Sequence, residues 1–125
     1  MILDTNGLSA MADGDPLLEP VLARANELAL PVVVLGEYRY GIAQSRNRIR
    51  YEKWLKELIS NCRVLNVDDA TAGEYAILRA ELKRGGRPIP ANDAWIAALA
   101  RQHSMPVISR GEHFDSVPKL KRIAW

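Results

Sequence analysis

The chain has 125 residues, the length of a single domain, and 48% of them are hydrophobic and 26% charged. This balance is typical of a globular protein and excludes a disordered or fibrous one. The 17 basic and 15 acidic residues leave a formal net charge of only +2. That value excludes a polycationic tail, so the position of the charges is more informative than their sum.

The cysteine content and the apolar stretches bear on where the protein works. The single cysteine, Cys62, excludes an internal disulfide framework and a cysteine-built zinc site, and it favours a reducing compartment. The longest uncharged apolar stretch, residues 28–36, has nine residues and contains a proline, whereas a membrane-spanning helix needs roughly 20. The first residues lack the basic region of a signal peptide. We therefore expect a cytoplasmic protein without a membrane segment.

Short apolar segments predict the strands. Each segment is uniformly apolar or β-branched and does not alternate with polar residues, as expected of strands that are covered on both faces. In chain order the segments are Met1–Leu3, Pro31–Leu35, Val64–Val67, Pro106–Ser109 and a weaker Leu120–Ala124.

Helical patterns fill the sequence between these strands. Apolar residues recur at spacings of three and four over residues 17–28, 51–59 and 75–82. The third of these helices is expected to have Asp68 or Asp69 as its N-terminal cap and to end at Gly85-Gly86. A further helix begins at Asn92-Asp93 and is apolar nearly all round through Ala100, which places it at the centre of the molecule.

Strands that alternate with helices predict right-handed crossovers and a parallel sheet. The expected class is therefore α/β, with about five parallel strands and helices on both faces. The chain contains no repeat, low-complexity tract or long linker. We expect one domain over residues 1–125.

Acidic and polar residues follow the predicted strands. Asp4 ends the first strand, Glu37 follows the second, and Ser109 ends the fourth, while Asp93 begins the apolar helix. Singly, each has an ordinary explanation: Asp93 as a helix cap, Asp4 in a polar turn, and Glu37 favoured by a helix dipole. In a parallel sheet, however, ligands bind at the carboxyl ends of the strands, where these residues converge.

Three carboxylates on one rim would repel each other, by about 4 kcal/mol per pair at 4 Å and an effective dielectric constant near 20. A divalent cation would neutralise them. Asp and Glu oxygens without His or Cys suit Mg²⁺ or Mn²⁺. Such an ion activates water and stabilises charge on a phosphoryl group. The pattern thus favours metal-assisted hydrolysis of a phosphodiester.

Four motifs in order carry a resemblance to a known family. They are Leu3-Asp4-Thr5-Asn6, then residues 36–42 (Gly-Glu-Tyr-Arg-Tyr-Gly-Ile), then Ile89-Pro90-Ala91-Asn92-Asp93 with Ile96-Ala97-Ala98, and Val107-Ile108-Ser109-Arg110 with His113-Phe114-Asp115. Together they resemble the PIN domain over essentially the whole chain, and most closely the VapC-type toxins of bacterial and archaeal toxin–antitoxin pairs.

The resemblance implies a Mg²⁺- or Mn²⁺-dependent endoribonuclease, usually a homodimer, that a cognate VapB-type antitoxin holds inactive. Carried over by position, Asp4, Glu37 and Asp93 match the acidic catalytic residues, with Asp4 and Asp93 as metal ligands. Asn6 matches a polar residue of the site, and Ser109 a hydroxyl that supports the first aspartate.

One position departs from the family pattern. The family commonly has an acid or an asparagine directly after the Ser/Thr-Arg pair, where this chain has Gly111. Asp115 is the first candidate to replace that acid and enters the expected catalytic set, with Glu112 as the second. Asp115 equally fits a cap of the turn before Val117. If neither residue reaches the ion, three acids hold it.

Basic and aromatic residues point to partners. Arg39, Arg110 and Arg87 are the expected RNA contacts because they lie next to site residues or in the loop that leads to Asp93. His113 is expected to be structural or to contact RNA. The resemblance assigns the aromatic residues Tyr38, Tyr40, Tyr51 and Trp54 to contacts with the antitoxin or a second subunit.

Other functions remain open from the sequence. One is a degenerate PIN domain that binds RNA or a protein without cleaving. A phosphoacceptor receiver domain fits poorly, because Asp4 has no acidic neighbour and Asp68-Asp69 resemble a helix cap. A flap-endonuclease type of DNA nuclease needs more chain for an arch and a duplex-binding element.

Overall fold

The computed structural model describes all 125 residues, and its elements alternate as predicted. The strands are β1 (Ile2–Leu3), β2 (Ala29–Pro31), β3 (Arg63–Leu65), β4 (Val107–Ile108) and β5 (Arg122–Ile123). The helices are α1 (Thr5–Ala12), α2 (Glu19–Ala23), α3 (Val32–Ile42), α4 (Arg48–Ile59), α5 (Asp69–Arg84) and α6 (Ala91–His103), with a 3₁₀ helix η1 (Glu112–Ser116).

The five strands form one parallel sheet in the order β3-β2-β1-β4-β5. The predicted fold class is therefore confirmed. Strand order reverses at β1, which pairs with β2 on one side and with β4 on the other. Such a reversal opens a crevice at the carboxyl ends of the two diverging strands, and ligands of open α/β sheets bind there.

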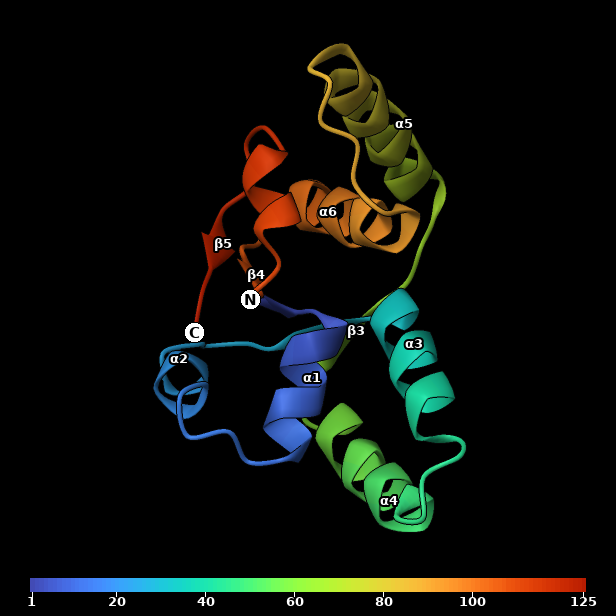
Figure 1. Ribbon diagram of the computed structural model, residues 1–125, viewed down its shortest axis with the longest axis vertical. Helices are drawn as coiled ribbons and strands as arrows, with labels where there is room; N and C mark the ends of the chain where they lie inside the picture. The colour runs from blue at the N-terminus through green and yellow to red at the C-terminus, as the bar shows by residue number, and fades with distance from the viewer.

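Helices cover the sheet on both faces, as Figure 1 shows, with α1, α3 and α4 grouped on one side of the strands and α5, α6 and η1 on the other. The strands supply the centre of the core, since Ile2, Leu3, Val107 and Ile108 are all fully buried. In α6, Ala94 and every residue from 96 to 100 are buried as well, so the prediction of a central apolar helix is confirmed. No helix of the molecule is long and apolar enough to cross a membrane.

The start of α5 agrees with the predicted cap. Asp68 accepts a hydrogen bond from the Thr71 backbone N–H at 3.0 Å, and the Thr71 hydroxyl accepts one from the Asp68 N–H at 3.1 Å, which closes a capping box. Gly85 is the C-terminal cap. Both ends of this helix could be found because capping chemistry is local.

The second strand and the first helices differ from the prediction. Strand β2 covers residues 29–31, and the β-branched run after it starts α3 instead of continuing a strand. The buried residues Val34, Tyr38 and Ile42 recur every fourth position, which is the period of a helix face. Helix α1 follows Asp4 where only a polar turn was considered, and α2 occupies just residues 19–23 of the predicted helix over 17–28.

Candidate functional site

Asp4 lies at the carboxyl end of β1, the strand at which strand order reverses. It is the N-cap residue of α1, and its Oδ1 accepts a hydrogen bond from the Gly7 N–H at 2.8 Å. The side chain is only 6% exposed. Burial raises the pKa of its carboxyl, the hydrogen bonds from Ser109 and Gly7 lower it, and the charge of Glu37 raises it.

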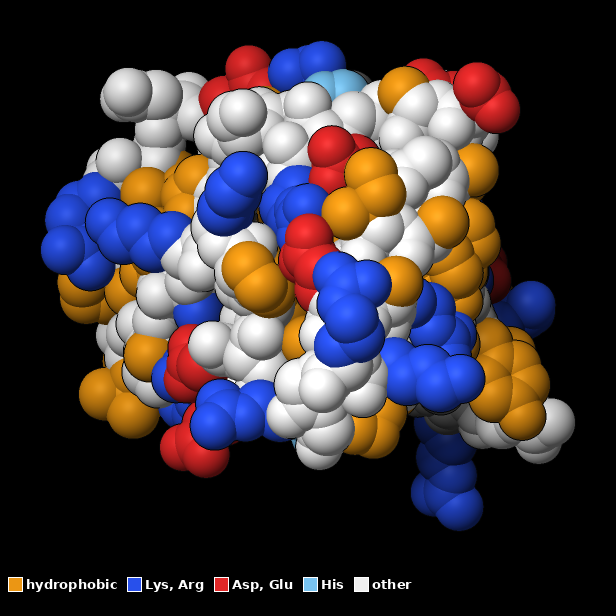
Figure 2. Space-filling model, turned by 90° about the horizontal axis from the view of Figure 1, so that it is seen from above, with side chains coloured by type: hydrophobic (Ala, Val, Ile, Leu, Met, Phe, Trp, Pro, Cys, Tyr) orange, Lys and Arg blue, Asp and Glu red, His pale blue; other side chains and the backbone are white.

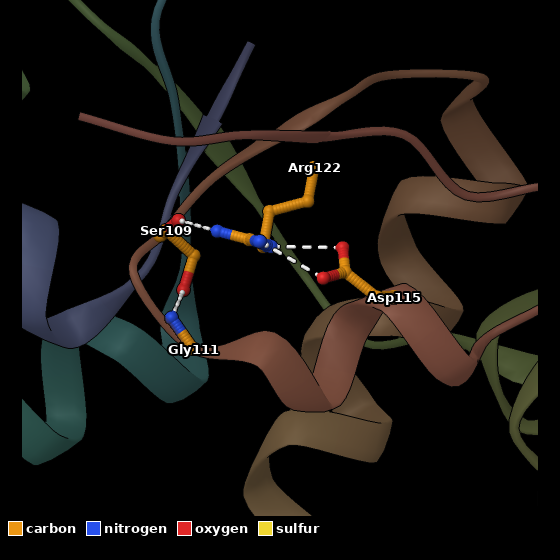
Figure 3. A network of polar contacts seen from close by, with 4 residues as sticks. All are labelled: Ser109, Gly111, Asp115 and Arg122. Carbon is orange, nitrogen blue, oxygen red and sulfur yellow. Dashed lines mark hydrogen bonds and ion pairs between the residues drawn. The ribbon is translucent and has the colours of Figure 1, made fainter.

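Ser109 reaches the same carboxylate from the next strand. Leu3 pairs with Ile108 in the β1–β4 ladder, so the residues after them, Asp4 and Ser109, end adjacent strands. The fully buried Ser109 hydroxyl donates to Asp4 Oδ2 and accepts from the Gly111 N–H at 2.8 Å. Figure 3 shows this backbone contact. The Gly111 N–H therefore fixes the Ser109 hydroxyl as a donor toward Asp4.

Gly7 permits the close approach of α1 to β1. A Cβ atom at this position would lie 2.6 Å from Leu3 Cδ1 and 3.1 Å from Asp4 Oδ1. Real Cβ atoms do not tolerate the first of these distances, so any side chain here displaces Leu3 or the helix start. The glycine thus holds the Asp4 carboxylate in its capping position.

Glu37 comes from the second turn of α3, which begins directly after β2. Its Oε1 accepts a hydrogen bond from the Thr5 hydroxyl at 2.8 Å. Thr5 directly follows Asp4 and starts α1. This contact fixes one carboxylate oxygen of Glu37 and leaves Oε2 without a hydrogen bond from the protein.

Asp93 is the third residue of α6 and is half-buried. It does not cap the helix, because Pro90 is the N-cap residue and no side chain makes the cap hydrogen bond. Burial raises the pKa of its carboxyl, the positive charge of His113 lowers it, and the charges of Asp4 and Glu37 raise it. The three predicted carboxylates therefore lie within electrostatic range of one another.

The donor set fits a hard divalent cation in type and charge. Asp4, Glu37 and Asp93 offer only carboxylate oxygens, which Mg²⁺ and Mn²⁺ prefer, and the two aspartates carry raised pKa values that a cation would relieve. However, no group of three or more His, Cys, Asp or Glu side chains stands close enough to hold an ion. The structure brings these carboxylates into one neighbourhood but not to coordination distance.

Asp115, the expected replacement for the missing acid, forms an ion pair with Arg122. Both of its oxygens accept hydrogen bonds from the Arg122 guanidinium, each at 2.8 Å (Figure 3). Arg122 also donates to the Ser109 backbone oxygen at 3.1 Å. The pair lowers the pKa of Asp115 and links η1 to β5. Glu112 is exposed, and its charge acts on Arg122.

The other predicted residues lie on several different elements. Asn6 is exposed on the first turn of α1, and Arg87 is exposed in the loop before α6. Arg39 lines a groove of about 360 Å³ against Leu55 and other residues of α4. Arg110 pairs with Asp15 at 3.4 Å.

Sequence reasoning missed the side chains that hold the site residues in place. Thr5 was passed over as part of a polar turn, and Gly7 carries no signal apart from its position three residues after Asp4. Arg122 was missed because its partners, Asp115 and Ser109, meet it only through the β4–β5 ladder. The contact of Arg110 with Trp125, whose ring centre lies 4.8 Å from the guanidinium, was also missed.

We compared the chain with known protein families and with curated proteins. The family model described as the PIN domain matches residues 1–120. Among curated relatives, Ribonuclease VapC5 of Mycobacterium tuberculosis is 35% identical over 118 residues, which cover 93% of this chain and 86% of that protein. The tRNA(fMet)-specific endonuclease VapC of Shigella flexneri is 30% identical over 100 residues, 79% of this chain and 76% of that one.

Solved structures agree with the fold. The structure of DNA-bound VapBC from Salmonella typhimurium superposes with a TM-score of 0.87 at 26% identity, over 99% of this chain and 96% of the matched one. That of VapBC2 from Rickettsia felis bound to a promoter DNA fragment gives a TM-score of 0.86 at 26% identity, over 99% and 97%.

Proposed function

Because the chain belongs to the PIN-domain family, whose model it matches over residues 1–120, we propose that it is a VapC-type endoribonuclease toxin. It hydrolyses RNA phosphodiester bonds with Mg²⁺ or Mn²⁺ and is neutralised by a VapB-type antitoxin. The names of the relatives support this activity, since they include a ribonuclease and an endonuclease specific for a transfer RNA.

The observation that carries the proposal is the buried Asp4 carboxylate at the crevice between β1 and β4, with Glu37 and Asp93 in electrostatic range. A fold gains nothing in stability from bringing like charges together in a place that withholds water from them. Binding a cation offsets that cost. Asp4, Glu37 and Asp93 form the catalytic set, and Asp4 and Asp93 hold the ion.

Each residue has a distinct task. An ion held by Asp4 and Asp93 would supply the positive charge that activates water and stabilises the phosphoryl oxygens. Asp4 stays ionised and correctly turned because Ser109 and Gly7 hold its two oxygens. Glu37, fixed through Oε1 by Thr5, takes a proton from the attacking water at Oε2. Asn6, at the rim, contacts the substrate.

The relatives' complexes support a proposal about the partners. The matched structures hold VapC-type chains together with VapB partners, and we propose an equivalent antitoxin here, together with a homodimer in its absence. The α3–α4 side carries exposed apolar residues suited to such contacts, among them Tyr40 at 85% and Ile49 at 76% exposure.

The test uses the antitoxin-free chain incubated with total cellular RNA in Mg²⁺, in Mn²⁺ and in EDTA. We expect discrete fragments that need metal and disappear in Asp93→Asn. Asp69→Asn makes the same chemical change on the exposed first turn of α5 and serves as the matched control. Cleavage that survives in EDTA or in Asp93→Asn contradicts the proposal. No cleavage in any metal, without Mn²⁺ binding by calorimetry, points instead to a degenerate PIN domain that only binds.

A further inference from the structure

A groove of about 410 Å³ lies between the end of α5 and the chain that returns from it to α6. Its apolar lining comes from Leu82, which is buried, and from Pro88 and Ile89 of the returning loop. Arg79 and Lys83 line it from α5 and are exposed. The groove therefore combines an apolar surface with two cationic side chains.

The cations of this region are not used inside the protein. Arg79, Lys83 and Arg87 form no ion pair, in contrast to Arg101 of α6, which pairs with Glu74 at 3.2 Å and with Glu81 at 2.9 Å. Figure 2, which looks onto the end of the molecule where α5 terminates, shows Lys and Arg side chains interspersed with acidic ones on this face. Exposed cations without an acidic partner favour a polyanionic ligand.

Arg79 is held in position by aromatic side chains and not by an acid. Its Nη1 donates to the Tyr75 hydroxyl at 2.6 Å, and its guanidinium lies 5.4 Å from the Tyr75 ring centre. Tyr75 in turn stacks on Trp95 of α6, with ring centres 3.8 Å apart and planes within 14°. This stack leaves the guanidinium charge free for a phosphate while fixing its place relative to α6.

The groove and the carboxylates share one piece of chain. The loop that carries Pro88 and Ile89 leads directly into α6, and Asp93 follows Ile89 by four residues. Trp95, against which the Arg79–Tyr75 stack rests, lies two residues beyond Asp93. The groove is therefore lined in part by the loop that leads into the helix carrying Asp93.

We propose that this groove binds one nucleotide of single-stranded RNA beside the cleaved bond. Arg79 and Lys83 hold the flanking phosphates, and Leu82, Pro88 and Ile89 contact the face of the base. A single strand is required because the base faces of a duplex are stacked and closed to side chains. The inference rests on the proposed function, since it makes the groove part of the substrate path to the carboxylates.

The experiment measures RNA binding apart from cleavage. A fluorescent single-stranded RNA 12-mer is titrated with the antitoxin-free chain in EDTA, and fluorescence anisotropy gives Kd at several salt concentrations. The test variant is Arg79→Ala/Lys83→Ala. The matched control is Arg46→Ala/Lys53→Ala, which removes two exposed cations that also form no ion pair, beside and within α4. A third variant, Ile89→Ala, trims the apolar lining alone.

The test variant is expected to raise Kd roughly tenfold or more and to reduce the slope of log Kd against log salt by about 1.4. The control raises Kd less than threefold. Ile89→Ala weakens the binding of the 12-mer but has no effect on the binding of a strand of the same length that lacks bases. Equal losses in test and control variants, or equal binding of duplex and single strand, overturn the inference. So does a change of oligomeric state in the test variant with RNA binding intact, because it makes the groove a protein interface.

Binding and cleavage fail separately. If metal-dependent cleavage occurs but the groove variants bind and cleave like the unmodified chain, this inference is wrong and the proposed function stands. If neither Mg²⁺ nor Mn²⁺ supports cleavage, the nuclease proposal fails. If the groove variants then still show a selective loss of affinity for single-stranded RNA, the groove assignment is supported.

Discussion

The Ser109 hydroxyl donates to Asp4 Oδ2 across 105 residues of sequence, and both side chains are buried. The contact joins the ends of β4 and β1 at the point where strand order reverses. The Gly111 N–H occupies the acceptor side of the same hydroxyl at 2.8 Å. The Ser109 hydrogen therefore has one direction available, toward Asp4, and it offsets part of the desolvation of that carboxylate.

Removing this donor should weaken both the fold and the site. Ser109→Ala leaves Asp4 Oδ2 buried without a partner, which costs about 1–3 kcal/mol in the free energy of unfolding. The pKa of Asp4 rises further because the lost hydrogen bond lowered it, so RNA cleavage should shift to higher pH. Denaturant unfolding and the pH profile of cleavage check these effects. Ser109→Thr keeps the hydroxyl and should restore the pH profile. If Ser109→Ala loses stability but keeps the profile, Ser109 acts on packing alone.

Asp93 should make the metal-free protein less stable at neutral pH. Burial, Asp4 and Glu37 raise its pKa above the ordinary 3.8, so the folded state binds this proton more tightly than the unfolded state does. The contribution to stability is therefore complete below pH 3.8 and is lost as the pH rises through the folded-state pKa. In EDTA at pH 7, Asp93→Asn should gain about 0.5–1 kcal/mol after allowance for solvent screening.

Unfolding in EDTA between pH 4 and pH 8 measures that difference. The gain of Asp93→Asn over the unmodified protein should shrink as the pH falls. Mg²⁺ or Mn²⁺ should reverse the order, since a ligand that binds only the folded state stabilises it and the variant has lost a proposed ion ligand. A variant that is less stable than the unmodified protein in EDTA at pH 7 contradicts the assignment of charge repulsion at this site.

Thr5→Val should reduce activity without much effect on the fold. Valine keeps the shape of the half-exposed side chain but cannot donate to Glu37 Oε1, a bond of 2.8 Å between α1 and α3. A freed Glu37 spends less time in the productive orientation, and we expect kcat to fall about tenfold with little change in KM. Single-turnover cleavage measures this. Thr5→Ser retains the hydroxyl and should keep most of the rate; equal losses in both variants would assign Thr5 to packing.

A structural feature could be predicted from the sequence when residues close to it along the chain determine it. Capping of α5 by Asp68 and the buried face of α6 follow from residues within a few positions, and both were predicted. The end of β2 was not, because Val32–Leu35 has the composition of a strand and becomes a helix only through the tertiary burial of Val34 and Tyr38.

The same distinction separates the site residues that could be predicted from those that could not. Asp4 and Asp93 could be proposed because each lies at the end of a predicted strand or the start of a predicted helix. The part played by Thr5 required knowledge of how α3 crosses α1, and that of Asp115 required the register of β4 against β5. Both depend on contacts between elements, and a residue pattern along the sequence does not reveal such contacts.

Asp115 therefore supplies the final prediction, because its position in the sequence and its contacts suggest opposite roles. Its position after the His113-Phe114 pair suggests that it is the missing fourth acid. In the structure, however, both its oxygens accept hydrogen bonds from Arg122. Asp115→Asn should leave the metal affinity and the cleavage rate within about twofold of the unmodified protein. It should lower Tm, because it breaks the pair that ties η1 to β5.

Arg122 lowers the pKa of Asp115, so the stabilisation is present above the ordinary value near 3.8 and is lost as the pH falls through the lower folded-state pKa. The Tm difference between Asp115→Asn and the unmodified protein should accordingly be constant from pH 8 to pH 5 and narrow only in stronger acid. If cleavage instead falls as far as in Asp93→Asn while Tm stays unchanged, Asp115 leaves Arg122 when substrate or metal binds and serves as the fourth acid after all.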